Sequence, residues 1–97
     1  MSPYIILSRF SPEAFEKPKD FLLLAKEVSQ RIRTDCPGLK WKDSYATLGR
    51  FDVVDVVEGA DPKEVERAAR IIRGYGHSTT ETLVASPWKE FLGMLEK

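Results

Sequence analysis

Apolar positions with the period of a β-strand alternate along this chain with stretches that have the period of a helix. The most apolar stretch follows Gly49, and its valines predict a central strand of about seven residues. Val53 and Val57 fall on one face of this strand, and Val54 and Val56 fall on the other. A strand that is apolar on both faces needs cover on both sides.

The same reasoning predicts further strands on either side of this one. Residues 3–10 form a first strand, which is also apolar on both faces. Residues 39–48 form a second strand after a break at Cys36-Pro37-Gly38. Residues 77–85 are rich in β-branched side chains and form the last strand.

Helices are predicted between these strands. Ser11-Pro12 begins a short helical turn that Pro18 restarts, and a main helix covers residues 20–33. Its apolar face consists of Phe21, Leu24, Ala25, Val28 and Ile32.

The second helix has the clearest start in the chain, because Asp61, Pro62 and Glu64 form a capping box. Gly74 is predicted to end it. A last helix is capped by Ser86-Pro87. The apolar faces of these two helices are Val65, Ala68, Ala69 and Ile72 in the former and Trp88, Phe91, Leu92 and Leu95 in the latter.

A two-residue turn at Gly49-Arg50 fixes the pairing of the strands that flank it. One face then carries the pairs Leu48–Phe51, Ala46–Val53, Ser44–Asp55 and Lys42–Val57, which read as core. The other face carries Thr47–Asp52, Tyr45–Val54, Asp43–Val56 and Trp41–Glu58, a mixture typical of a cleft. A one-residue bulge would change both sets.

The order of elements predicts a single α+β domain over residues 1–97 with the ferredoxin-like βαββαβ arrangement. Two helices lie on one face of a four-stranded antiparallel sheet, and an extra helix follows at the C-terminus. The other face of the sheet stays uncovered although it is apolar. We therefore expect a homodimer that packs sheet against sheet as a dimeric α/β barrel, with a higher oligomer as an alternative.

Composition disfavours several classes of partner. Fifteen Lys and Arg balance fifteen Asp and Glu, so neither nucleic acid nor a membrane surface is expected. The first residues lack a basic leader and a cleavage site, so a cytoplasmic location is expected.

The single cysteine, Cys36, is expected to be a loop residue without a nucleophilic role. No metal site or cofactor motif is found in the sequence.

Three residues are weak candidates for chemistry. Asp52 follows the glycine turn, where holding its own hairpin is its favoured role. Asp55 lies among valines, so it should either find Arg9, Lys42 or Ser44 as a partner or have a raised pKa, and a carboxylate with a raised pKa could serve as a proton acceptor. His77 is the only histidine and a candidate general base, although no orienting partner is evident.

Candidate ligand-binding residues come from the mixed face of the hairpin. Trp41, Tyr45, Thr47 and Asp52 together could frame a cleft between two sheets for a flat or partly apolar small molecule. Packing at a dimer interface is the favoured use of Trp41 and Tyr45.

The segment 45–54 (YATLGRFDVV), with Val57-Glu58 and with Thr80-Glu81-Thr82-Leu83 and Ala85, resembles the GYD-domain proteins. The resemblance implies a small dimeric α/β-barrel protein, similar to the ligand-binding domain of leucine-responsive regulators, and it implies no particular reaction. Phe51 stands where the tyrosine that names the family is expected, and Asp55 stands where a small or apolar residue is expected.

Three functions are consistent with these patterns. The leading hypothesis is a non-catalytic dimer that binds a small metabolite. An alternative is a cofactor-independent enzyme, similar to small α/β-barrel monooxygenases or isomerases, with His77 or Asp55 as base. The third is a structural or assembly role, in which an edge strand or the last helix recruits another protein.

Overall fold

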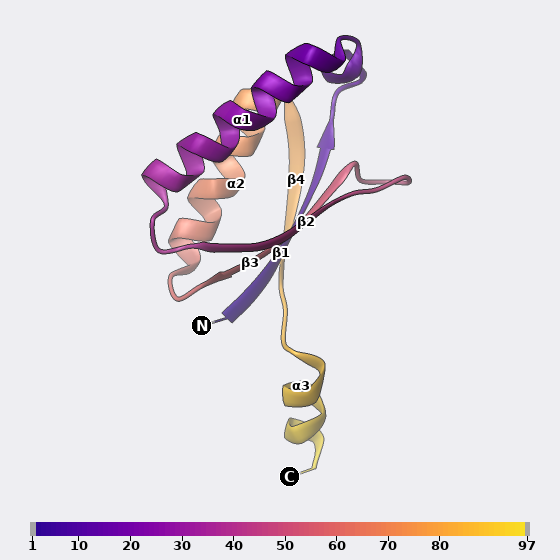
Figure 1. Cartoon of the computed structure of the whole chain (residues 1–97). Coiled ribbons are helices and arrows are strands. Elements are labelled where there is room, and N and C mark those ends of the chain that lie inside the picture. Colours follow the sequence, from indigo (N-terminus) through magenta and orange to yellow (C-terminus); the bar gives the residue numbers. More distant parts are fainter. Residues whose placement is uncertain (1, 97) are drawn as a thin grey trace.

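The structure is a computed structural model that describes residues 2–96 (Figure 1). Four strands form one sheet in the order β2-β3-β1-β4, and all neighbouring strands are antiparallel. The predicted ferredoxin-like fold is confirmed. The elements in chain order are β1 (Ser2–Phe10), η1 (Pro12–Phe15), α1 (Pro18–Asp35), β2 (Lys40–Ala46), β3 (Val53–Gly59), α2 (Pro62–Gly76), β4 (Ser78–Val84) and α3 (Trp88–Leu95).

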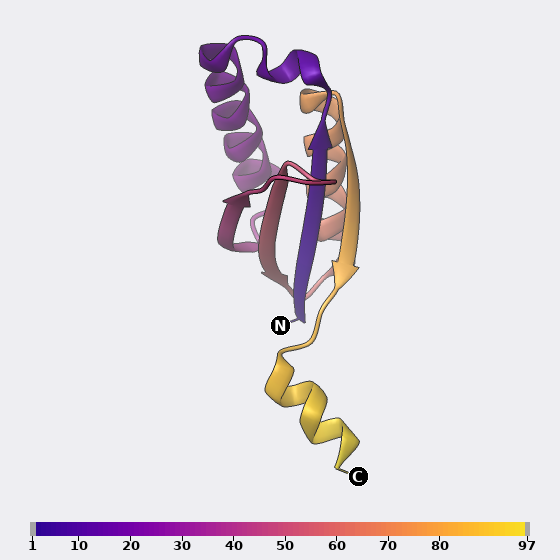
Figure 2. The same cartoon turned by 90° about the vertical axis from the view of Figure 1, so that its right-hand side faces the viewer.

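Helices α1 and α2 lie side by side on one face of the sheet, as the two views show (Figures 1 and 2). The core lies between α2 and the two central strands, β1 and β3. Tyr4, Ile6 and Val57 are buried there against α2. Removal of their apolar surface from water stabilises this packing. The α2 side of this core is formed by Val65, Ala68 and Ile72.

The start of α2 agrees with its prediction. The Asp61 carboxylate accepts a hydrogen bond of 2.9 Å from the backbone N–H of Lys63, as expected of an N-cap. The predicted end at Gly74 is wrong, because the helix continues to Gly76. It stops where His77 takes up a left-handed conformation with φ of 47°, and this change in the direction of the backbone ends the helix.

The β2–β3 hairpin has a longer loop than the predicted two-residue turn. The strands end at Ala46 and resume at Val53, and Leu48 lies fully exposed in the loop instead of on the core face. Gly49 has a φ of 133°, which favours glycine at this position. The pairs Ala46–Val53, Tyr45–Val54, Ser44–Asp55 and Asp43–Val56 are confirmed.

A β-bulge overturns the predicted register before Asp43, at the pairs of Trp41 and Lys42. The pairing shifts between Trp41 and Asp43, so that Trp41 lies opposite Val57 instead of Glu58. The bulge adds one residue on the β2 side and moves Trp41 to the helix-covered face, where Ser44 also points. Trp41 and Tyr45, which we predicted to share a face, therefore lie on opposite faces of the sheet.

The face of the sheet away from the helices is open and does not close into a barrel within one chain. Two cross-strand rows run over it, with apolar residues at their centre. The first row is Tyr45–Val54–Leu7–Glu81, and the second is Asp43–Val56–Ile5–Leu83.

Helix α3 projects away from the rest of the chain beyond the end of β4 (Figures 1 and 2). Ser86, the predicted cap, is not the N-cap. The helix begins after Pro87 without a side-chain cap, because the extended backbone of Pro87 fixes the start one residue later. The exposed fractions of its large apolar side chains range from 40% at Phe91 to 71% at Trp88.

Asp52 fastens the hairpin to the central strand β1. Its carboxylate Oδ2 accepts a hydrogen bond of 2.9 Å from the backbone N–H of Phe10. Its own backbone N–H donates to the carbonyl of Ser8 at 2.8 Å, and its carbonyl accepts from Thr47 at 2.9 Å. The side chain therefore connects two strands, whereas we predicted that it would hold its own turn.

The Asp52→Ala substitution should lower the free energy of unfolding by about 1 to 2 kcal/mol, because it leaves the Phe10 N–H without its charged acceptor. Asp52→Asn keeps an acceptor and should have a smaller effect. Urea unfolding at matched protein concentration measures this, with Asp43→Ala on the open face as control. An equal effect of Asp52→Ala and Asp43→Ala would contradict this role.

Candidate functional site

A cavity of about 650 Å³ lies between α1 and the sheet. Of the predicted apolar face of α1, only Ile32 is buried, whereas Phe21, Leu24 and Val28 are half-buried. The helix packs on α2 and on η1 instead of lying flat on β2. The apolar walls of the cavity therefore come from both layers: Leu24, Val28 and Ile32 of α1, Val53 of β3, Leu39 before β2 and Ile72 of α2.

The polar centre of the cavity is the carboxylate of Asp55, which is 6% exposed. Its Oδ1 accepts a hydrogen bond of 2.6 Å from the Ser44 hydroxyl and one of 3.1 Å from the indole N–H of Trp41. The indole N–H also lies 3.0 Å from the Ser44 oxygen. Of the partners predicted for Asp55, Ser44 is thus the one observed.

The bulge in β2 makes this arrangement possible. Ser44 lies directly opposite Asp55 across the β2–β3 pair. In a regular strand, residues 41 and 44 would point to opposite faces. The extra residue at position 42 places Trp41 on the same face as Ser44, so that its indole N–H reaches the carboxylate.

Ser8 is a second buried polar group in the cavity wall, and it is only 1% exposed. Its hydroxyl oxygen has no hydrogen-bond partner among the described residues. On the helix-facing side of the sheet, Ser8 is opposite Val53 and Ile6 is opposite Asp55. Ser8 and Asp55 are therefore diagonal neighbours, roughly 7 to 8 Å apart.

Aromatic rings close one end of the cavity. Phe10 and Phe21 line it, and their ring centroids lie 5.4 Å apart in an edge-to-face arrangement. Phe15 of η1 packs on Phe21 at 4.6 Å. Such contacts add to the burial of apolar surface and keep the start of α1 in place.

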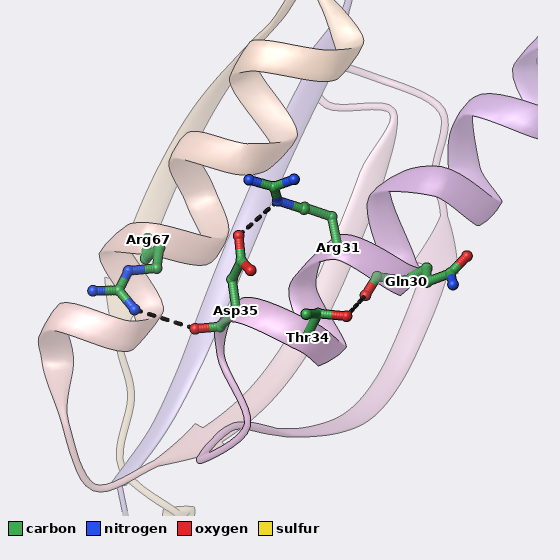
Figure 3. A network of polar contacts seen from close by, with 5 residues as sticks. All are labelled: Gln30, Arg31, Thr34, Asp35 and Arg67. Atoms are coloured by element: carbon green, nitrogen blue, oxygen red, sulfur yellow. Dashed lines mark hydrogen bonds and ion pairs between the residues drawn. The ribbon is translucent and has the colours of Figure 1, made fainter.

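The other end of α1 is held by polar contacts (Figure 3). Arg31 donates to the Asp35 carboxylate at 2.6 Å, and Arg67 of α2 donates to the Asp35 carbonyl at 3.2 Å. The hydrogen bond and the negative charge of Asp35 raise the pKa of the Arg31 guanidinium. Both ends of α1 are thus attached, while its middle stands over the cavity.

Cys36 is the C-cap residue of α1 and lies in the loop before Pro37-Gly38, as predicted, but its side chain is buried and belongs to the core. It also lines the cavity. Burial raises the pKa of the Cys36 thiol, the carboxylates of Glu64 and Asp35 raise it further, and Arg67 opposes them. A thiol in this state stays protonated at neutral pH and is a poor nucleophile.

The structure does not bring the four predicted ligand-binding residues to one space. Trp41 lines the cavity, whereas Tyr45 lies on the open face and is 56% exposed. Thr47 donates to the Phe51 carbonyl at 2.6 Å, and Asp52 accepts from Phe10. The cavity within one chain lies on the helix-covered face of the sheet, opposite the face on which Tyr45 lies.

The two candidate bases also lie apart. Asp55 lies in the cavity, but His77 is exposed at the end of α2 and does not line it. Sequence reasoning missed Ser8 and Arg33 as lining residues. Ser8 carried a usable signal, because it is a small polar residue at a position whose neighbours of the same parity, Tyr4, Ile6 and Phe10, are large and apolar.

Two shallower hollows, of about 440 and 420 Å³, lie on the outer surfaces of α1 and α2 and contain no buried polar group.

Within residues 2–96, every helix is too short or too polar to cross a lipid bilayer.

Two solved structures share this fold. The chain is similar to an antibiotic biosynthesis monooxygenase, with a TM-score of 0.56 and 18% identity over 90% of this chain and 100% of that one. It is also similar to a putative antibiotic biosynthesis monooxygenase from Caulobacter crescentus, with a TM-score of 0.53 and 12% identity over 89% and 91% of the two chains. At these identities the likeness concerns the fold alone.

The sequence comparison defines the family. The GYD domain model matches residues 4–95, and this chain belongs to the GYD domain family. A relative from Thermus thermophilus is 32% identical over 96 residues, which cover 99% of this chain and 100% of that protein. It is named glutamine synthetase and cystathionine beta-lyase binding protein.

Cys36 should react slowly with iodoacetamide at pH 8 in the folded protein, at least roughly tenfold more slowly than in urea, because it is buried and protonated. Since its pKa is raised on folding, its contribution to stability is complete below the pKa of an ordinary thiol, about 8.5. That contribution decreases as the pH rises further. Equal alkylation rates in both states would contradict this assignment.

Proposed function

We propose that this protein binds a small, largely apolar molecule in the cavity between α1 and the sheet, without transforming it. The observation that supports this most is the buried carboxylate of Asp55 in a cavity whose walls are mostly apolar. Ligand sites in proteins are commonly of this volume, with apolar walls and a few convergent polar groups. Trp41, Ser44 and Asp55 provide those groups here.

An enzymatic role finds less support in the geometry. Asp55 is the one candidate base in the cavity, and both of its donors are engaged with the same carboxylate oxygen. His77 is not available to it as a second acid or base, because it does not line the cavity. The arrangement fits recognition of a ligand better than a paired acid and base.

A second function, binding of other proteins, is supported by the name of the Thermus relative. In this chain, α3 presents large apolar side chains to solvent, with Trp88 at 71% and Met94 at 66% exposure. Exposed apolar surface of this kind is typical of sites where proteins meet. Both functions can belong to one molecule, because α3 lies away from α1, α2 and the sheet (Figure 1) and contributes no residue to the cavity.

The open sheet face supports a homodimer as the form in which the protein acts. Ile5, Leu7, Val54 and Val56 form a contiguous apolar centre there, and the edge strands add Tyr45 and Asp43 on one side and Glu81 and Leu83 on the other. Packing of two such faces would bury this surface and produce the two-sheet barrel that the sequence predicts.

Filling the cavity should abolish ligand binding. Val28→Trp places a large ring into the space, whereas the control Val28→Ile adds a single methyl group. Native mass spectrometry of the protein from its own host should show a retained molecule in the wild type and in Val28→Ile, and none in Val28→Trp. A retained mass that Val28→Trp leaves unchanged would place the ligand elsewhere and contradict the proposal.

Val54→Lys should convert the dimer to a monomer, because it places a charge at the centre of the open face. The control is Gln30→Lys, which adds the same charge on the exposed outer side of α1. Light scattering after size-exclusion chromatography reports the mass of each. A wild-type monomer, or a dimer that Val54→Lys leaves intact, would rule out this interface.

A further inference from the structure

We propose that the cavity selects ligands whose head group is a protonated amine, held by Asp55 and Ser8, with an apolar body along α1. This inference rests on the proposed ligand binding and adds the chemical class of the ligand.

The charge of Asp55 is the first argument. The two ion pairs among the described residues, Arg31–Asp35 and Arg70–Glu66, are both on the surface and leave Asp55 without a cation. A carboxylate that is 6% exposed loses most of its hydration, and two neutral donors replace only part of it. A cationic ligand would supply the missing countercharge.

The position of the free acceptors is the second argument. Trp41 and Ser44 both donate to Oδ1 of Asp55, which leaves Oδ2 for another donor. The Ser8 hydroxyl is 1% exposed and has no partner among residues 2–96. An ammonium group has three N–H donors and no acceptor, so one such group between the two side chains can satisfy both.

The apolar walls of the cavity indicate the shape of the rest of the ligand. Phe10, Phe21 and Trp41 contribute aromatic surface, and aliphatic residues of α1, β3 and α2 line much of the remainder. Arg33 is the positively charged residue among those that line the cavity. Its side chain is exposed and donates to the Ser29 hydroxyl at 3.1 Å, so it lies at the mouth of the cavity and not beside Asp55. A small aryl-alkyl amine matches this arrangement, with the ring among the apolar side chains.

The experiment compares three probes with the same phenyl body, namely 2-phenylethylamine, 2-phenylethanol and 3-phenylpropionate. Calorimetric titration should show that the amine binds the wild type at least roughly tenfold more tightly than the alcohol or the acid, as expected for a buried hydrogen bond to a charged group. In Asp55→Asn this preference should disappear. The control Glu27→Gln removes a negative charge from an exposed position of α1 that does not line the cavity, and it should keep the preference.

The test does not depend on the folding of Asp55→Asn alone. The preference of the wild type for the amine needs no variant, and a second variant gives an independent measurement. Ser8→Ala removes a hydroxyl that has no partner and should weaken amine binding roughly threefold or more, while binding of the acid stays unchanged.

The outcomes separate the two proposals. If the alcohol or the acid binds as tightly as the amine, or if Asp55→Asn keeps the preference, the amine selectivity is wrong and the cavity remains a ligand site. If no probe binds the wild type, or if Val28→Trp binds all three as well as the wild type does, the proposed function itself fails.

Discussion

The need to solvate one carboxylate in the middle of an apolar sheet shapes this half of the molecule. Asp55 lies between Val54 and Val56 on a strand whose helix-facing side is otherwise core. Its donors have to come from the neighbouring strand, and β2 provides them by means of a bulge that turns Trp41 towards Ser44. An apolar helix packed directly on this polar cluster would remove the remaining solvation of the carboxylate. Helix α1 is attached to α2 and η1 and leaves a cavity over this cluster.

Much of the fold follows from local patterns in the sequence. The valines of β3 and the capping residue Asp61 gave correct elements because each signal is local and strong. Four cross-strand pairs next to the hairpin were also correct, since alternation of side chains carries the register along regular strands.

The site could be predicted only in part, because its decisive features are not local. The bulge at position 42 depends on the face of the sheet on which the Trp41 side chain packs. No glycine or other turn residue in the sequence indicates a bulge there. The distance of α1 from the sheet depends on its attachment to α2 and to η1, whereas its apolar period alone predicts close packing. Asp55 and Trp41 were identified as candidates, but their meeting required the three-dimensional structure.

The bulge also bears on how the protein keeps its strands from associating at random. Strand β2 is an edge of the sheet, and an edge offers free backbone groups to any other extended chain. The irregular pairing at position 42 interrupts that row of groups, and Lys40 and Lys42 add charge along it. The same extra residue that brings an indole to Asp55 thus makes this edge a poor template for aggregation.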